Sequence, residues 1–146
     1  MRIYLDNCSL QRPIDDQSQA RIEQETEAVI IILSFCEAGT LMLVSSEVLQ
    51  IEIGENLDLE RKEMVLETLQ VAEEIVLVNP IIEKRAQELE KYGIKAFDAL
   101  HLASAEAGKA DYFCTCDDKL LKKTKILDDL QVKAVSPIEL LEEIWK

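Results

Sequence analysis

Basic residues are absent from a long stretch of this 146-residue chain. Between Arg21 and Arg61 there is no lysine or arginine, whereas nine residues in that stretch are acidic. Over the whole sequence 29 acids oppose 16 bases, which gives a formal net charge of -13. This balance excludes a protein that holds nucleic acid through a broad basic surface.

Long apolar runs and flexible linkers are also lacking. The longest apolar run, Ala28–Leu33, is far shorter than the ~20 residues that a helix needs to cross a bilayer. The first residues contain no hydrophobic region of a signal peptide, so we expect a soluble, cytoplasmic protein. No segment rich in proline, glycine or serine divides the sequence, and 48% of its residues are hydrophobic. We therefore expect residues 1–146 to form a single domain.

Cysteine and histidine are too sparse to predict a structural zinc site. Zinc sites of that kind need four sulfur or nitrogen ligands at recognisable spacing, and this chain has four cysteines and one histidine without such spacing. In a chain without a secretory signal, the cysteines are expected to stay reduced.

Short apolar segments alternate with amphipathic segments along the chain. The expected strands are 3–5, 41–44, 75–78, 112–115 and 132–135, with a polar loop after the first. Helices are expected over 18–37, around 48–53, over 58–72, from 80 to near 93, over 99–107, from about 118, and from 136 to the end. Such alternation predicts a three-layer α/β fold, in which right-handed crossovers build a parallel sheet with helices on both faces.

Four acidic residues fall where this fold class binds ligands. In open parallel sheets, ligands bind beyond the carboxyl ends of the strands. Asp6 directly follows the first strand, and Asp117 follows the strand near residue 115. Asp98 opens an apolar helix, and Glu52 lies in the short helix after the second strand. We therefore expect the four carboxylates to approach the same edge of the sheet.

Carboxylates that share a cleft predict a divalent metal ion. Several of them cannot all ionise cheaply unless a cation compensates their charge. Hard Mg2+ or Mn2+ ions prefer oxygen ligands and are commonly bound by a few carboxylates together with substrate phosphates. A site of this kind activates water for attack on a phosphodiester bond.

Each acid also has an ordinary structural interpretation. Asp6 suits a turn, and Asp98 suits the N-cap of its helix. Asp117 competes with the next aspartate for the cap of the following helix, and an acid such as Glu52 in a short helix is usually solvated. His101 shares a helical face with Asp98, but its apolar helix favours a buried, hydrogen-bonded histidine over a catalytic base. These alternatives stay open from the residues alone.

Basic residues gather after the last of these acids. Lys119, Lys122, Lys123 and Lys125 lie on or near one expected helix, and Arg12 lies soon after the first acid. They are candidates for contacts with phosphate, although a solvated helix face is the ordinary alternative.

Three segments together resemble a PIN domain: Ile3–Asn7, Asp98–Ala103 and Ala110–Asp118. The resemblance covers nearly the whole chain and implies a Rossmann-like fold with a central parallel sheet flanked by helices. It further implies a Mg2+- or Mn2+-dependent ribonuclease, a group that includes VapC-like toxins paired with small antitoxin proteins.

The resemblance also implies which residues form the site. It assigns the family's catalytic, metal-binding acids to Asp6, Glu52, Asp98 and Asp117. The chain departs from the family after the first aspartate, where Asn7 and Cys8 stand in place of the usual hydroxyl residue and small polar residue.

We therefore interpret residues 1–146 as one PIN-like nuclease domain that hydrolyses RNA with Mg2+ or Mn2+. Its partners would be an RNA substrate and a small antitoxin, without a membrane. Many such domains form homodimers, and core packing is an equal explanation for the apolar helix faces of this chain. Two other functions compete. A catalytically silent protein-binding module of the same fold is one, and an aspartate phosphatase is the other. The phosphatase is disfavoured because Cys8 stands where that class needs a second aspartate.

Overall fold

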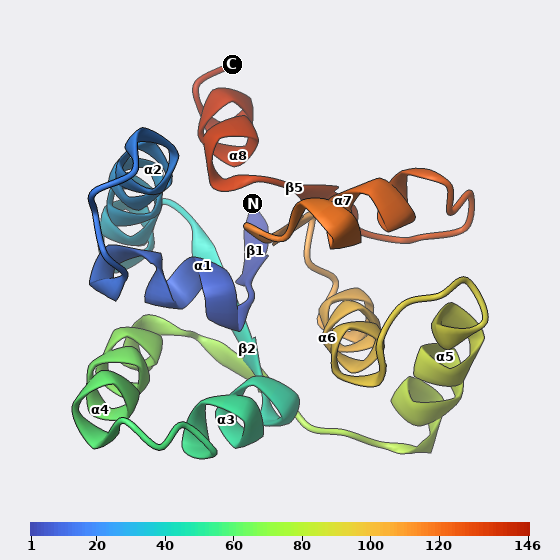
Figure 1. Cartoon of the computed structure of the whole chain (residues 1–146). Coiled ribbons are helices and arrows are strands. Elements are labelled where there is room, and N and C mark those ends of the chain that lie inside the picture. Colours follow the sequence, from blue (N-terminus) through green and yellow to red (C-terminus); the bar gives the residue numbers. More distant parts are fainter.

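The computed structural model describes the whole chain, residues 1–146. Five parallel strands form one sheet in the order β3-β2-β1-β4-β5. Their bounds are β1 (Arg2–Leu5), β2 (Met42–Ser46), β3 (Glu74–Val76), β4 (Tyr112–Cys114) and β5 (Lys133–Val135). The strand order reverses between β1 and β4, the two neighbours that pair in parallel at the middle of the sheet. The expected α/β class is confirmed (Figure 1).

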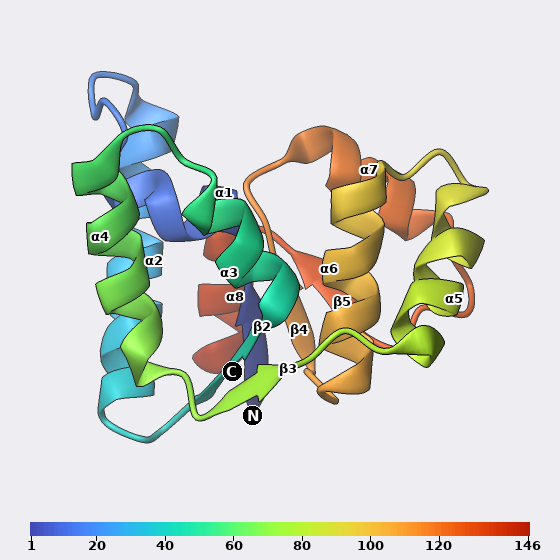
Figure 2. The same ribbon diagram turned by 90° about the horizontal axis from the view of Figure 1, so that it is seen from below.

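Helices cover both faces of this sheet. Figure 2 shows α2 and α4 on one side and α5, α6 and α7 on the other, while α8 packs against α2. The α-helices are α1 (Asn7–Gln11), α2 (Ala20–Glu37), α3 (Glu47–Gly54), α4 (Leu59–Thr68), α5 (Pro80–Glu90), α6 (Ala96–Ala107), α7 (Asp118–Lys125) and α8 (Pro137–Ile144). Two short 3-10 helices, η1 (Arg12–Ile14) and η2 (Leu69–Val71), complete the set. None of these helices combines the length and the apolar character needed to cross a membrane.

Local capping explains where several helices begin. The Ser46 hydroxyl accepts a hydrogen bond from the third residue of α3, and Asn79 caps α5 just before Pro80. At the start of α8, Ser136 and Glu139 form a reciprocal capping box. These starts agree with the boundaries that the sequence predicts.

Helix α6 approaches the sheet closely at its carboxyl end. A side-chain carbon at Gly108 would lie 2.9 Å from a methyl group of Val44 and 2.9 Å from one of Val76. The lack of a side chain at Gly108 therefore permits the close approach of α6 to β2 and β3. Strand β1 lies at the middle of the core, with Ile3, Tyr4 and Leu5 fully buried.

The structure differs from two sequence-based expectations about local structure and rules out one alternative. The segment after Asp6 is not a polar loop but contains α1 and η1. The sequence does not predict α1, whose first turn is capped by a hydrogen bond from Ser9 N to the Asp6 carboxylate. Asp98 is not an N-cap, since Lys95 occupies that position and Asp98 lies in the first turn of α6. Strand β3 is also shorter than expected and ends at Val76.

Candidate active site

A cleft of about 310 Å³ opens at the carboxyl edge of the sheet, where the strand order reverses. Its walls are formed by Asp6, Asn7, Cys8, Gln11, Asp15, Glu52, Asp98, His101 and Asp117. Five of these residues are acidic, and no lysine or arginine lines the cleft. The fold thus places the four acids singled out from the sequence in one cleft, from the end of β1, α3, α6 and the start of α7.

Asp6 is the most buried of the four acids. Its residue is 6% exposed, and Ser9 N donates to its Oδ1 atom at 3.0 Å. The Cys8 thiol donates to the same carboxylate, with Sγ 3.1 Å from Oδ1 and 3.2 Å from Oδ2. Burial raises the pKa of Asp6, while hydrogen bonds from Thr115, Cys8 and Ser9 act in the opposite direction. Cys8, which stands in place of the small polar residue that the PIN resemblance implies, therefore supplies a hydrogen-bond donor to Asp6.

Asp98 shares the negative field of the cleft. It is half-buried in the first turn of α6. Burial is the main cause that raises its pKa, followed by the charge of Asp6 and, more weakly, by the charges of Asp117 and Glu52. Asp98 therefore responds electrostatically to all three of the other acids.

Asp117 is exposed and caps α7. Its Oδ1 atom accepts hydrogen bonds from Lys119 N at 2.9 Å and Leu120 N at 3.2 Å, so it is the cap in preference to its neighbour. Its own N–H donates to Thr115 Oγ1 at 3.1 Å. The second carboxylate oxygen accepts no hydrogen bond from the protein. Capping and ligand binding are thus compatible for this residue.

Glu52 contacts the only histidine of the chain. His101 Nε2 lies 3.2 Å from Glu52 Oε1, and His101 Nδ1 lies 2.6 Å from the Tyr4 hydroxyl. The histidine is 1% exposed, which confirms the interpretation of a buried, hydrogen-bonded side chain. It nevertheless lines the cleft. Its spacing from Asp98 on the sequence is a signal for this placement, but nothing in the sequence indicates the contact with Glu52.

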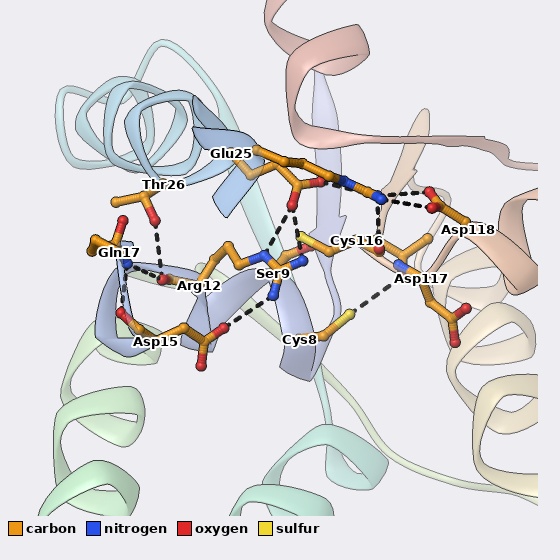
Figure 3. A network of polar contacts seen from close by, with 12 residues as sticks. Cys8, Ser9, Arg12, Asp15, Gln17, Glu25, Thr26, Cys116, Asp117 and Asp118 are labelled. Carbon is orange, nitrogen blue, oxygen red and sulfur yellow. Dashed lines mark hydrogen bonds and ion pairs between the residues drawn. The ribbon is translucent and has the colours of Figure 1, made fainter. Parts of the chain in front are cut away.

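The fifth acid, Asp15, differs from the other four because arginines neutralise it. Arg12 and Arg61 approach its carboxylate at 3.1 Å and 2.8 Å. Arg12 also binds the buried carboxylate of Glu25 at 2.9 Å, and Figure 3 shows it between these two acids. Its guanidinium is therefore engaged within the protein, contrary to its expected availability for phosphate. A neighbouring ion pair joins Arg21 to Asp118 at 2.7 Å.

The chemistry of the cleft fits a hard divalent cation. Four carboxylates lack a lysine or arginine partner there, and Mg2+ and Mn2+ prefer oxygen donors of this type. The carboxylate oxygens do not surround a single point, since no three acidic, histidine or cysteine side chains converge closely enough to enclose a metal ion. The fit to the ion therefore rests on the type and charge of the donors.

A sequence model of the PIN domain matches residues 4–127. This chain belongs to the PIN domain family. Members of the family are generally nucleases, and the cleft of this PIN domain coincides with the edge of the sheet where its four acids were expected. A search of curated protein sequences gave no match.

Solved structures show the same fold as this PIN domain. PAE2754 from Pyrobaculum aerophilum is similar with a TM-score of 0.61 and 15% sequence identity, over 99% of this chain and 90% of that one. A chain of VapBC2 from Rickettsia felis, solved bound to a DNA fragment from the promoter, is similar with a TM-score of 0.57 and 16% identity. That match covers 93% of this chain and 98% of the other.

Proposed function

We propose that this PIN domain, as one unit of residues 1–146, is a Mg2+- or Mn2+-dependent endoribonuclease. Asp6, Glu52, Asp98 and Asp117 are its catalytic and metal-binding residues. The observation that carries the proposal is that these four carboxylates, from four separate elements, line one cleft without a lysine or arginine.

The residues of the cleft divide the chemistry among them. A bound divalent cation supplies Lewis-acid activation of water and stabilises charge on the phosphate. Asp6 offers oxygens whose orientation is fixed by Ser9 N–H and the Cys8 thiol. Asp117 offers its second oxygen while the first caps α7. Glu52, held at Oε1 by His101, helps to bind and orient water. Because water attacks instead of the ribose 2' hydroxyl, the products carry a 3' hydroxyl and a 5' phosphate.

Lysines beside the cleft provide a route for the RNA backbone. Lys95, Lys119 and Lys123 border a small hollow whose other walls include Asp98 and Asp117. Lys95 and Lys119 can contact phosphates next to the cleaved bond, whereas Lys123 Nζ donates to the Gly93 carbonyl at 2.8 Å. The cleft itself stays negative. Contact with substrate would then be local, which agrees with the strongly acidic whole molecule.

We further propose that the nuclease is the toxin of a type II toxin-antitoxin pair, since VapBC2 shares its fold. A second, larger hollow of about 620 Å³ lies between α2 and α4. Its lining includes Ile14, Ile30 and Met64 together with the acids Glu37 and Glu67. An amphipathic antitoxin helix with basic flanks would match this apolar floor and acidic rim. The same groove supports the alternative, a silent protein-binding module, and a homodimer stays a prediction.

An RNA cleavage assay tests the enzyme. The purified protein is incubated with single-stranded RNA and Mn2+, and Asp98→Asn is compared with Asp128→Asn, the same change at an exposed residue outside the cleft. We expect cleavage by the wild type and by the control but not by Asp98→Asn or in EDTA. Cleavage that survives Asp98→Asn, or that needs no metal, refutes the nuclease proposal.

Calorimetric measurement of Mn2+ binding distinguishes the nuclease from the silent protein-binding module. A silent module would form a tight protein complex and show no heat of Mn2+ binding, whereas the nuclease binds Mn2+ in a manner that Asp98→Asn weakens.

A further inference from the structure

A series of hydrogen bonds links Ser46, at the start of α3, to Glu52 in the middle of the same helix. It passes through Tyr4 of β1 and His101 of α6. The Ser46 hydroxyl lies 2.6 Å from the Tyr4 hydroxyl, which lies 2.6 Å from His101 Nδ1. His101 Nε2 then lies 3.2 Å from Glu52 Oε1. The first three residues are at most 1% exposed, so solvent cannot replace a missing partner.

The available donors and acceptors determine which atom donates in each of these hydrogen bonds. Ser46 Oγ already accepts a hydrogen bond from Leu49 N, so its own proton is free to go to the Tyr4 oxygen. Tyr4 then donates to Nδ1 of His101, and Nε2 carries the proton that faces the Glu52 carboxylate. In the reverse direction, the Ser46 proton would have no acceptor in the structure. A neutral His101 would then also turn a lone pair toward a carboxylate. Only the first direction satisfies every buried group.

We infer that His101 is a positioning residue for Glu52, whose carboxylate it holds at the cleft through an Nε2–H tautomer fixed by Tyr4 and Ser46. The catalytic consequence rests on the proposed function, in which Glu52 helps to bind metal and water. The tautomer itself does not depend on that function. Partners of this kind behind a ligand set its orientation.

Packing around these hydrogen-bonded side chains holds them in place. The Tyr4 ring stacks on Phe113 of β4, with centroids 5.4 Å apart and 13° between the planes. His101 belongs to α6, as does Asp98, and lies three residues further along the same face. The hydrogen bond to Glu52 therefore also sets how α3 and α6 present their two acids to each other.

Nitrogen NMR of the metal-free protein tests the tautomer directly. With a single histidine, the two ring nitrogens of 15N-labelled protein can be assigned without ambiguity. We expect a proton on Nε2, protected from exchange with water, and an unprotonated Nδ1. An Nδ1–H tautomer with an unprotonated Nε2 overturns the inference.

Two isosteric substitutions test the positioning role. In His101→Gln the amide nitrogen reaches toward the place of Nε2 and can still donate to Glu52. In His101→Asn the amide lies near the place of Nδ1, so it keeps Tyr4 and loses Glu52. We expect His101→Asn to lower Mn2+ affinity and kcat about 10- to 100-fold, with KM for RNA little changed. His101→Gln should recover most of that loss.

Ser104→Ala is the matched control, because Ser104 is a buried residue of the same helix whose hydroxyl has no hydrogen-bond partner. It should leave Mn2+ affinity and kcat unchanged. His101→Asn and His101→Gln could instead lose Mn2+ affinity and kcat equally, with the same fall in melting temperature. That result would show that His101 has a purely structural role. If the wild type cleaves no RNA, the proposed function fails, while the NMR result still decides the tautomer.

Discussion

Arg61 of α4 donates to Asp15 at the rim of the cleft, with Nη1 2.8 Å from Oδ1. The same guanidinium donates to the Ile14 carbonyl at 3.0 Å and to the Gln11 side chain at 2.6 Å. A single arginine thus fastens α4 to the segment that follows Asp6. Gln11 and Asp15 face the cleft, whereas Ile14 faces the apolar groove between α2 and α4.

Replacing Arg61 tests this connection. Arg61→Leu should lower the free energy of unfolding by about 1–2 kcal/mol, because three acceptors lose a charged donor at a partly exposed site. Urea denaturation measures the change. Lys62→Leu is the control, since the side chain of the neighbouring lysine makes no hydrogen bond or ion pair and its loss should cost much less. A loss of equal size in both variants would contradict the role of Arg61.

Glu25 provides a second stability test because its buried carboxylate depends on Arg12. The Glu25 side chain is 2% exposed and lies 2.9 Å from Arg12 and 3.7 Å from Arg21. Arg12→Leu should cost about 2–3 kcal/mol, since it leaves a buried charge with only its weaker partner. The double variant Arg12→Leu/Glu25→Leu should recover part of this loss. Additive losses in the double-mutant cycle would show that the pair is not coupled.

The raised pKa of Asp98 predicts that the metal-free cleft destabilises the fold at neutral pH. The folded state holds the proton of Asp98 more tightly than the unfolded chain does, so this group favours folding at low pH. That contribution is lost as the pH rises through the raised pKa. Asp98→Asn should therefore raise the melting temperature in EDTA at pH 7, and raise it less near pH 4.

Asp128→Asn, at an exposed residue, should leave the melting temperature almost unchanged at both pH values. Adding Mn2+ should stabilise the wild type more than Asp98→Asn. A ligand that binds the folded state stabilises it by an amount that grows with its affinity, and the variant lacks one of the proposed ligands. A melting temperature that falls in Asp98→Asn at neutral pH in EDTA would contradict the expected cost of burying the Asp98 charge beside the other acids.

Gly108 supplies a prediction about packing. In Gly108→Ala, the new methyl group would press against Val44 and Val76 at 2.9 Å, and we expect a loss of about 1–3 kcal/mol. The displaced α6 should also reduce RNA cleavage. Gly54→Ala is the control, because nothing lies within 4 Å of the added carbon and the residue is helical. Calorimetric melting of both variants measures the difference, and equal stability of the two would contradict the close approach of α6.

The sequence predicts much of the fold because its strands and helices leave strong local signals. Buried β-branched runs and caps such as Asn79 and Ser136 mark most elements, and strand ends locate Asp6 and Asp117. The helix after Asp6 escapes detection because it is a five-residue helix, held by one cap and by tertiary contacts.

The remaining walls of the cleft depend on long-range contacts that leave no local pattern. Arg61 is 46 residues from Asp15 in the sequence, and His101 is 49 residues from Glu52. No spacing rule relates the members of either pair. Only the packing of α4 against α1, and of α3 against α6, brings them together.

Strand β1 carries Tyr4 and leads directly into Asp6, and residues two apart on extended chain point to the same side of a sheet. Pairing with β2 and β4 on its two flanks holds this strand in place. Through Tyr4 and His101, Glu52 and the Asp98-bearing helix α6 are connected to the same strand as Asp6. Strand β1 thus helps to fix the positions of three of the four acids, Asp6, Glu52 and Asp98. Asp117, exposed at the start of α7, is instead held by the backbone of that helix, whose first turn it caps.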